Sequence, residues 1–434
     1  MNNKQSIFKY EGVNYLLPFI LITACFALWG FANDVTNPMV KAFSKIFRMS
    51  VTEGALTQVA FYGGYFAMAL PAAMFIRRFT YKKGILMGLG LYATGAFLFI
   101  AARSTGTYWP FLVAYFILTC GLSFLETSAN PYILAMGSPE TATRRLNFAQ
   151  SFNPIGSLCG MYVAMNFIQA RLNPLSSAER ASLPQAEYEA VRQSDLGILI
   201  KPYVIIGLVI VVMFLLIMLV RMPHVKEENK GSIRETLRDL IGNQRYREGV
   251  LAQFFYVGVQ IMCWTFIIQY GTRIFMEQGM SEIDAEVLSQ RYNIAAMIIF
   301  CCSRFICTWL MKYVSPGKML HFFALAGILC TLGVIFLQGI AGLYCLVAVS
   351  ACMSLMFPTI YGIALEGLGE DAKFGAAGLI MAILGGSILP PVQALIIDRG
   401  TIAGMPAVNV SFVLPMICFV VIAIYGYRVF KGRI

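Results

Sequence analysis

Arg77-Arg78-Phe79-Thr80-Tyr81-Lys82-Lys83-Gly84 is a short basic segment with an apolar run on either side, and this arrangement decides the fold. The runs cover residues 56–76 and 84–102, and each has about 20 residues, the length of a helix that crosses a bilayer. A basic segment between two such runs predicts a helical hairpin in a membrane, with its charged turn at the cytoplasmic surface.

The same pattern continues along the chain, which has 434 residues, 58% of them hydrophobic and only 13% charged. A soluble domain has about 25% charged residues, so this composition excludes an ordinary water-soluble protein. The predicted spans are 15–35, 56–76, 84–102, 109–136, 146–169, 196–220, 250–270, 292–311, 317–337, 341–365, 374–397 and 407–427. The predicted fold class is therefore an all-α membrane protein with twelve transmembrane helices.

Lys and Arg are distributed unevenly between the loops. If the N-terminus is cytoplasmic, the inside segments hold 21 basic residues and the outside segments hold 9. Membrane proteins keep Lys and Arg on the cytoplasmic side, so the net charge of +11 requires no nucleic-acid partner. We predict a multi-pass protein of a bacterial inner membrane with both termini cytoplasmic, and a first span that is not a removed signal segment.

The first and second parts of the chain resemble each other. Trp29 precedes Arg78 of the first basic segment by 49 positions, and Trp264 precedes Lys312 of a second basic segment by 48 positions. Each pair consists of a tryptophan in the first span of its half and a basic turn between the second and third spans. This spacing predicts two pseudo-symmetric halves of six helices each.

A cytoplasmic linker, residues 222–248, joins the two halves, which we place at residues 1–221 and 249–434. Within the linker, Ser232 and Glu235 form an S-x-x-E capping box, and apolar residues then recur at helical spacing. We predict a short amphipathic helix against the inner face of the membrane. Two six-helix halves joined by a basic linker are the plan of the major facilitator superfamily.

Glu126 is the least expected polar residue of the predicted spans, because placing a polar side chain inside a membrane span costs free energy. It lies about seventeen residues into the fourth span, near the middle of the membrane. An ionised carboxylate costs several kcal/mol there, so the group is expected to hold its proton until water reaches it. We predict that Glu126 is a proton carrier; the structural alternative is a Glu that stays protonated in a hydrogen bond to a neighbouring helix. Asn130, one turn later, is a candidate substrate contact.

The first span ends in a polar stretch. Asn33 and Asn37 are four positions apart and share a helix face, and Asp34 nearly aligns with Asn37. Asp34 is a candidate second proton-coupling group or an acceptor for sugar hydroxyls, with a solvated residue near the helix end as the alternative. Asn33 and Asn37 are candidate substrate contacts.

Three amides open the fifth span at a spacing of three: Asn147, Gln150 and Asn153. An amide donates and accepts hydrogen bonds at once, which suits sugar hydroxyls, so Gln150 and Asn153 are candidate substrate contacts. Hydrogen bonding between helices is the structural alternative for these amides.

Two tryptophans in matching spans, Trp29 and Trp264, offer flat apolar faces for a pyranose ring, with packing as the structural alternative. Gln260 stands one turn before Trp264 and is a further candidate contact. Arg304, inside the eighth span, is expected to reach the inner surface or to pair with a carboxylate.

The 11 cysteines and two histidines of the chain show no metal-ligand spacing. We therefore expect no metal, no cofactor and no disulfide. An enzyme working inside the membrane would need a nucleophile with a base, or metal ligands, within the bilayer. The sequence shows no such set, so we predict no catalytic residue and no enzymatic activity.

Five stretches of the sequence together carry a resemblance to a known family. They are Leu125-Glu126-Thr127-Ser128-Ala129-Asn130-Pro131, Arg145-Leu146-Asn147-Phe148-Ala149-Gln150-Ser151-Phe152-Asn153, Leu251-Ala252-Gln253-Phe254-Phe255-Tyr256-Val257-Gly258, Phe357-Pro358-Thr359-Ile360 and Asp371-Ala372-Lys373-Phe374-Gly375. In these stretches the chain resembles the L-fucose–proton symporter family of the major facilitator superfamily, from about Leu16 to its end. The resemblance implies a sugar site between the halves, Glu126 as the proton carrier, and sugar contacts at Trp29, Gln150 and Asn153.

The chain departs from this family in its first span. The family pattern has an Asp where an ungapped match places Asn37, and it has an Asn where this chain has Asp34. Either Asp34 takes over the role of that carboxylate, or Glu126 works alone.

The predicted function is a proton-coupled sugar symporter that imports L-fucose by alternating access. Glucose, galactose and N-acetylglucosamine are alternative substrates. A proton-coupled drug or metabolite exporter of the same fold is the alternative of another class, and the amides favour a sugar carrier over it; a channel is a further alternative. The predicted partners are a sugar, protons and membrane lipid, and we expect a monomer.

Overall fold

The computed structural model describes residues 9–10, 13–36, 39–49, 56–175, 177–222, 232–337 and 339–434. The chain divides into two compact units. Unit 1 comprises Met1–Met136 and Phe152–Lys226, and unit 2 comprises Gly137–Ser151 and Glu227–Ile434. The segment Gly137–Ser151 therefore groups with the second unit, whereas the halves predicted from the sequence place it in the first.

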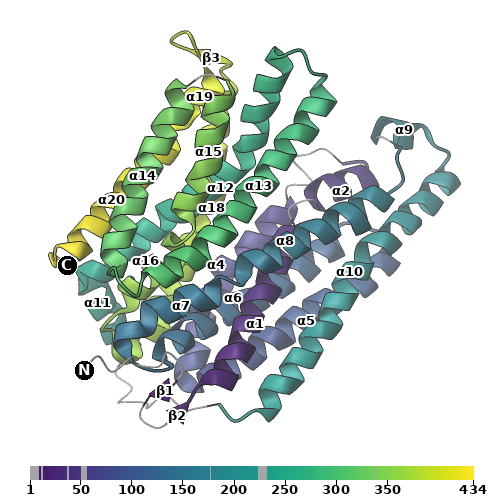
Figure 1. Cartoon of the computed structure of the whole chain (residues 1–434). Helices are drawn as coiled ribbons and strands as arrows, with labels where there is room; N and C mark the ends of the chain where they lie inside the picture. The colour runs from purple at the N-terminus through teal and green to yellow at the C-terminus, as the bar shows by residue number, and fades with distance from the viewer. Residues whose placement is uncertain are drawn as a thin grey trace. The chain divides into compact units, whose positions relative to one another are not determined.

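Unit 1 is a bundle of long helices, with the antiparallel strands β1 and β2 near the N-terminus (Figure 1). A π-helical turn and a 3-10 turn follow α8, at Ala164–Ile168 and Gln169–Arg171. The bounds are β1 (Lys9–Tyr10), β2 (Val13–Asn14), α1 (Leu16–Thr36), α2 (Met39–Ile46), α4 (Leu56–Arg78), α5 (Tyr81–Thr105), α6 (Trp109–Ala135), α8 (Asn153–Val163), α9 (Ser177–Ser182) and α10 (Gln185–Leu219).

Unit 2 is also a helical bundle, with one small hairpin (Figure 1). The two-residue turn of the hairpin has positive φ at Ala403 and Gly404, as tight β-hairpins require. Three 3-10 turns interrupt the helices, at Pro139–Thr141, Gly369–Asp371 and Ala382–Leu384. The bounds are α7 (Ala142–Gln150), α11 (Ile233–Gly242), α12 (Gln244–Glu277), α13 (Glu282–Leu310), α14 (Pro316–Phe336), α15 (Ile340–Met353), α16 (Met356–Leu365), α17 (Ala372–Met381), α18 (Gly385–Ile397), β3 (Thr401–Ile402), β4 (Met405–Pro406), α19 (Ala407–Ser411) and α20 (Val413–Phe430).

Among the described residues, 11 helical segments are long and apolar enough to cross a membrane. They coincide with eleven of the twelve predicted spans, so the predicted class of an all-α membrane protein is confirmed. The exception is the span predicted at 146–169, where α7 ends at Gln150 and α8 begins at Asn153. The helix predicted there is divided in two, as is the helix of the span predicted at 341–365, where α15 ends at Met353 and α16 begins at Met356. Pro154, in the first turn of α8, has no backbone N–H to donate to the preceding turn, which explains the break.

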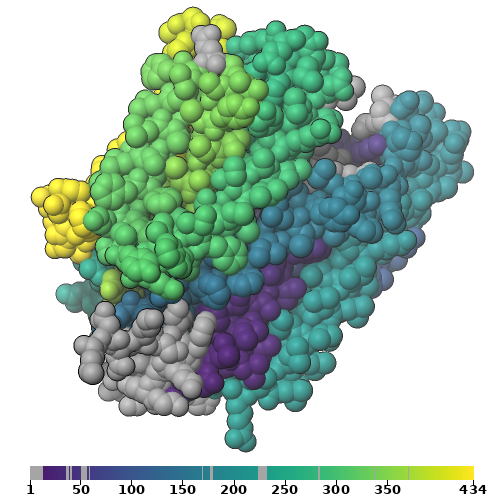
Figure 2. Space-filling view, in the orientation of Figure 1, coloured from purple at the N-terminus to yellow at the C-terminus, as the bar shows by residue number. Residues whose placement is uncertain are grey.

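The helices carry apolar side chains on their outer surfaces. In unit 2, α13 and α14 lie on the face turned toward the viewer in Figure 2, and Phe322, Leu329 and Phe336 of α14 are exposed. Contiguous apolar surface of this kind is rare on a protein in water, but it matches the chemistry of lipid chains. The surface therefore supports the assignment to a membrane.

The most deeply buried candidate span is α6 in unit 1, with 83% of its most apolar stretch buried inside the protein. Its backbone comes very close to that of α5, since a Cβ at Gly88 would lie 2.8 Å from the carbonyl oxygen of Gly121. This close packing removes the middle of α6 from water and from lipid. Any polar side chain there must find a partner inside unit 1.

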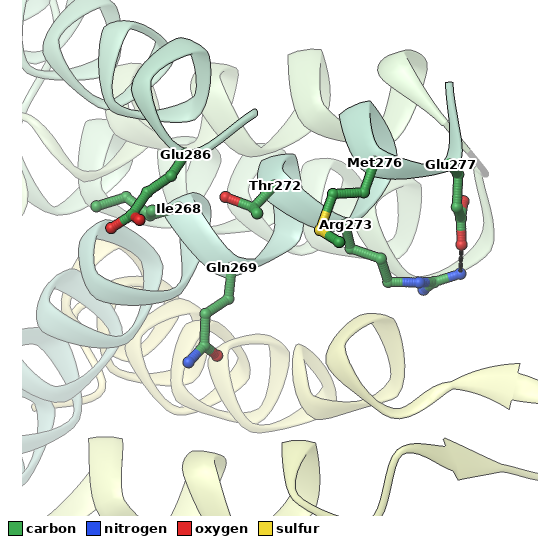
Figure 3. Close-up of a pocket in the computed structure, with 7 residues that line it drawn as sticks. All are labelled: Ile268, Gln269, Thr272, Arg273, Met276, Glu277 and Glu286. Carbon is green, nitrogen blue, oxygen red and sulfur yellow. Dashed lines mark hydrogen bonds and ion pairs between the residues drawn. The ribbon is translucent and has the colours of Figure 1, made fainter. Parts of the chain in front are cut away.

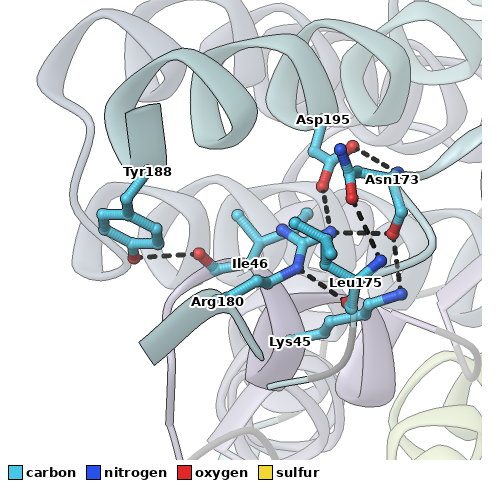
Figure 4. A network of polar contacts seen from close by, with 7 residues as sticks. All are labelled: Lys45, Ile46, Asn173, Leu175, Arg180, Tyr188 and Asp195. Carbon is cyan, nitrogen blue, oxygen red and sulfur yellow. Dashed lines mark hydrogen bonds and ion pairs between the residues drawn. The ribbon is translucent and has the colours of Figure 1, made fainter. Parts of the chain in front are cut away.

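A buried ion pair anchors the segment between α8 and α10 of unit 1 (Figure 4). Arg180 donates to Asp195 Oδ2 at 2.6 Å, and both side chains are buried. The backbone N–H of Asn173 donates to Asp195 Oδ1 at 2.9 Å, while its carbonyl oxygen accepts from Arg180 and, at 2.8 Å, from Lys45 Nζ. Partial burial, and then the charge of Arg180, lower the pKa of Lys45. These contacts tie α2 to the start of α10.

A helix follows the capping box of the predicted linker. The Ser232 N–H donates to Glu235 Oε2 at 2.9 Å, and the Ser232 hydroxyl accepts from the Arg234 N–H at 3.3 Å. These two bonds begin α11. Residues 223–231, which precede this helix and include His224, lie outside the described residues.

Candidate functional site

Glu126 lies in the core of unit 1, with 4% of its surface exposed. The hydroxyl of Tyr65, on α4, donates to Glu126 Oε1 at 2.8 Å. Asn130, one turn later on α6, donates through Nδ2 to the backbone carbonyl of Glu126 at 3.0 Å. The carboxyl group is thus withdrawn from solvent, as its depth in the sequence predicts, and it has the hydrogen bond to a neighbouring helix that the structural alternative also expects.

Tyr65 connects Glu126 to α1. Its hydroxyl oxygen lies 3.5 Å from Asn33 Oδ1, at the far limit of a hydrogen bond. A hydroxyl has one hydrogen to donate, so Tyr65 can serve Glu126 or Asn33 but not both fully. Sequence reasoning missed Tyr65, since a tyrosine in an apolar span is typical of packing and stands 61 positions from Glu126.

The candidate residues of the first span lie at different depths. Trp29 is buried, with 3% of its surface exposed, and its ring centroid is 4.0 Å from that of Phe26. Asn33 and Asp34 are partly buried on α1. Asn37 lies outside the described residues. Asn33 lies close to the Glu126–Tyr65 pair through its contact with the Tyr65 hydroxyl.

The break between α7 and α8 separates the amides of the fifth span. Within unit 2, Asn147 Nδ2 donates to Thr359 Oγ1 of α16 at 3.2 Å, and Gln150 is buried at the end of α7. Within unit 1, Asn153 Nδ2 donates to the carbonyl oxygen of Phe26 at 3.2 Å. The three amides therefore do not form one face of one helix. Asn147 and Asn153 each make a hydrogen bond between helices, the structural alternative that the sequence left open.

Arg304 is a buried cation on α13 of unit 2, with 3% of its surface exposed. Its Nε–H donates to the carbonyl oxygen of Ser354, and an Nη1 hydrogen donates to the carbonyl oxygen of Gln150 at 3.0 Å. Ser354 follows the last residue of α15, and Gln150 ends α7, so the guanidinium meets the negative ends of two helices. Arg304 does not reach the surface, and no carboxylate pairs with it in the part of the chain that the structure describes, so both expectations are wrong. Carbonyl groups at two helix ends stabilise its charge instead.

The second tryptophan, Trp264, lies partly buried on α12. Its Nε1–H donates to Ser350 Oγ of α15 at 3.2 Å, and its ring packs edge-on against Phe300 at a centroid distance of 5.0 Å. Gln260, one turn earlier on α12, is also partly buried. The structure therefore holds the Trp264 ring in a defined orientation, with Gln260 close to it along the helix.

A cavity of about 660 Å³ lies farther along α12, beside the start of α13 (Figure 3). Its volume is typical of small-molecule sites, which range over about 300–1,000 Å³. The lining residues are Ile268, Gln269, Thr272, Arg273, Met276, Glu277 and Glu286. Arg273 is already paired, since it donates to Glu277 Oε1 at 2.6 Å and to Asn409 Oδ1 at 3.2 Å. None of the predicted substrate contacts lines this cavity, so it does not coincide with the predicted site.

The described ranges contain no group of three or more His, Cys, Asp or Glu side chains that could hold a metal ion. The candidate residues offer the buried carboxyl group of Glu126 in unit 1, the buried guanidinium of Arg304 in unit 2, and neutral amides and hydroxyls. These groups can bind and release a proton and can form hydrogen bonds with neutral hydroxyl groups. Neither process forms or breaks a bond between heavy atoms.

The chain matches the family model described as Major Facilitator Superfamily over residues 20–391. It is 54% identical over 427 residues to the L-fucose-proton symporter of Haemophilus influenzae, covering 96% of this chain and 97% of that protein. It is 31% identical over 413 residues to the glucose/galactose transporter of Brucella abortus biovar 1, covering 95% and 94%. A solved structure, the major facilitator superfamily transporter FucP in the outward conformation, superposes with a TM-score of 0.86 at 33% identity, over 95% of this chain and 98% of that one.

Proposed function

We propose that the protein imports L-fucose together with protons by alternating access. The premise is that the chain belongs to the major facilitator superfamily, and within it to the L-fucose–proton symporter family. The observation that carries the proposal is the buried Glu126 carboxyl group in contact with Tyr65. A relative named as a glucose/galactose transporter supports hexose transport as the second candidate function.

Glu126 is the proposed proton carrier, and Tyr65 is the group that responds to its state. The ionised carboxylate accepts the Tyr65 hydrogen in a charge-assisted bond, which is about twice as strong as a bond to a neutral acceptor. When Glu126 takes up a proton, this advantage disappears, and the Tyr65 hydrogen becomes available to Asn33 at 3.5 Å. Proton uptake on α6 then changes the polar surface of α1.

Coupling follows if sugar binding involves Asn33. The proton and the sugar would then stabilise the same conformation, and each would raise the affinity for the other by the same factor. Asp34, next in sequence to Asn33, is the proposed second proton-coupling group. The proposed sugar contacts are Trp29, Asn33, Asn37, Asn130, Gln150, Asn153, Gln260 and Trp264.

Further parts of the proposal concern the setting of the protein. We place it in a bacterial inner membrane as a monomer with both termini on the cytoplasmic side, supported by the 21 to 9 distribution of Lys and Arg. The halves are proposed at residues 1–221 and 249–434, joined by 222–248. The curated relatives reported above are named as transporters, which supports a protein without enzymatic activity.

The test is uptake of labelled L-fucose into proteoliposomes with an inward proton gradient. The purified protein should accumulate the sugar, and a protonophore should abolish the accumulation. Unlabelled glucose, galactose and N-acetylglucosamine serve as competitors, and stronger competition by glucose or galactose than by L-fucose itself would favour the second candidate. No accumulation of any of these sugars would contradict the proposal.

Glu126→Gln separates proton coupling from sugar binding. The amide keeps the size of the side chain and its hydrogen bond to Tyr65, but it cannot carry a proton. We expect exchange of internal for external sugar to continue while accumulation against a gradient is lost. Glu366→Gln, at an exposed position of unit 2, is the matched control and should accumulate sugar like the wild type. Accumulation by the Glu126→Gln variant would exclude Glu126 as the carrier.

A further inference from the structure

Gln253 of α12 is fully buried in unit 2, yet among the described residues neither the nitrogen nor the oxygen of its amide has a hydrogen-bond partner. The same holds within the described ranges for the buried hydroxyl group of Tyr425, whereas the buried Tyr256 hydroxyl has the Arg304 guanidinium beside it. Folded proteins leave few buried polar groups unpaired, because each one is costly. The unpaired groups of Gln253 and Tyr425 therefore need an explanation.

These groups lie along one buried face of α12, at the end that follows α11. A Cβ at Gly249 would lie 2.9 Å from the Tyr425 hydroxyl and 2.5 Å from the Ala364 Cβ, which places Tyr425 of α20 and Ala364 of α16 beside that turn. Gln253 follows Gly249 by four residues and Tyr256 follows it by seven, so all three share this face. The seven residues extend over about 10 Å of helix.

The two ends of this row differ in their surroundings. At one end, Tyr425 lies within electrostatic reach of Arg245 and Glu366, which form an exposed ion pair at 2.9 Å. At the other end, the Tyr256 hydroxyl lies within electrostatic reach of the buried Arg304 guanidinium. The row therefore leads from charged groups in contact with solvent to a cation in the core.

The chemistry of the row selects its ligand. An amide and two hydroxyls can both donate and accept, and they carry no charge. A hard cation would require several oxygen ligands that include carboxylates, and an anion would meet the Gln253 carbonyl oxygen. Water donates, accepts and usually makes about three hydrogen bonds when it is buried.

We propose that Tyr425, Gln253 and Tyr256 bind a row of ordered water molecules inside unit 2, which extends from the Arg245–Glu366 ion pair toward Arg304. These waters satisfy the Gln253 amide and the Tyr425 hydroxyl, and they reach the Tyr256 hydroxyl beside Arg304. They also lower the cost of holding the Arg304 cation in the core, because a buried charge is most expensive when it is fully desolvated. The site does not depend on which solute the protein transports.

Hydroxyl-radical footprinting by brief X-ray irradiation, read by mass spectrometry, tests this directly, because waters bound inside a protein oxidise the side chains beside them. The controls are Tyr246 and Tyr270, which are also buried but whose hydroxyls donate to backbone carbonyls at 3.1 Å and 3.0 Å. We expect Tyr256 and Tyr425 to be oxidised at least about fivefold faster than these controls, since buried waters collect at unpaired polar groups such as the Gln253 amide, and both tyrosines lie along the row of waters. Equal rates for all four tyrosines would overturn the proposal.

Gln253→Met gives a second, independent measurement, because it replaces the amide by an apolar chain of similar length. If water satisfies the amide, oxidation of Tyr256 should fall toward the rate of Tyr246 and the melting temperature should not rise. If the amide is dry, the substitution removes an unpaired polar group, so the melting temperature should rise with Tyr256 oxidation unchanged, which would overturn the proposal. Gln278→Met, at the exposed end of α12, is the matched control and should alter neither quantity.

Discussion

Replacing Arg304 by Met tests whether the buried guanidinium stabilises unit 2. Arg304 donates to the carbonyl oxygens of Ser354 and Gln150, at the ends of α15 and α7. Met fills a similar volume but donates no hydrogen bond. The substitution therefore leaves two buried helix ends without the donor that they have in the wild type.

Two effects of opposite sign decide how much Arg304→Met changes the free energy of unfolding. Each hydrogen bond from a charged donor contributes about 1.5–3 kcal/mol, so the two bonds together contribute about 3–6 kcal/mol. Removing the cation recovers part of this, because burying a charge costs several kcal/mol and an apolar replacement of a buried charge is sometimes stabilising. Here the bonds run to helix ends whose dipoles also favour a cation, so we expect a net loss of about 2–4 kcal/mol.

The assay is thermal unfolding of the purified protein in detergent. A loss of this size corresponds to a fall in melting temperature of about 5–10 °C for a unit of this length. Arg304→Lys keeps the charge but not the planar fork that spans both carbonyls, so its melting temperature should lie between wild type and Arg304→Met. Arg273→Met is the matched control: its exposed ion pair with Glu277 contributes about 0–1 kcal/mol, and its hydrogen bond to Asn409 contributes about 1 kcal/mol more. A melting temperature of Arg304→Met at or above that of Arg273→Met would refute the reasoning.

Two further predictions concern unit 1. Tyr65→Phe removes the hydroxyl that donates to Glu126; we expect L-fucose accumulation to fall at least about tenfold but stability by only about 1 kcal/mol, the contribution of one hydrogen bond. Uptake assays and melting curves on the same preparation measure both quantities, and undiminished accumulation would contradict the role of Tyr65. Asp195→Asn leaves the buried Arg180 without its counter-charge and should cost about 3–5 kcal/mol, seen as a lower melting temperature. Glu189→Gln, in a more exposed pair, should cost less than about 1 kcal/mol, and equal shifts for the two variants would show that the buried pair contributes nothing special.

The fold was predictable from the sequence because its strongest signal is local. Eleven predicted spans coincide with long apolar helices, and the predicted membership of the major facilitator superfamily is confirmed by the match over residues 20–391. The break in the fifth span was missed, although Pro154 is visible in the sequence. A count of apolar residues does not register one missing N–H, and the packing around the two helix ends decides whether the chain bends or breaks there.

The candidate site was predictable only in part. Glu126 was found because a carboxyl group near the middle of an apolar run is rare, and the structure buries it as expected. The three amides of the fifth span were assigned to one face because a spacing of three implies it, but only in an unbroken helix. Arg304 was expected to seek the surface or a carboxylate, since carbonyl oxygens at helix ends have no signature in the sequence.

The sequence by itself determined that this chain is a helical membrane protein and that Glu126 lies deep within it. Hydropathy adds up over about 20 consecutive residues, and depth is counted along the same run, so both properties belong to one segment. Only the tertiary structure decided that Tyr65 serves Glu126 and that Arg304 meets the carbonyl oxygens of Gln150 and Ser354. These partners come from different helices, and they meet because side-chain volume and helix packing set which faces touch, a property that no single segment carries.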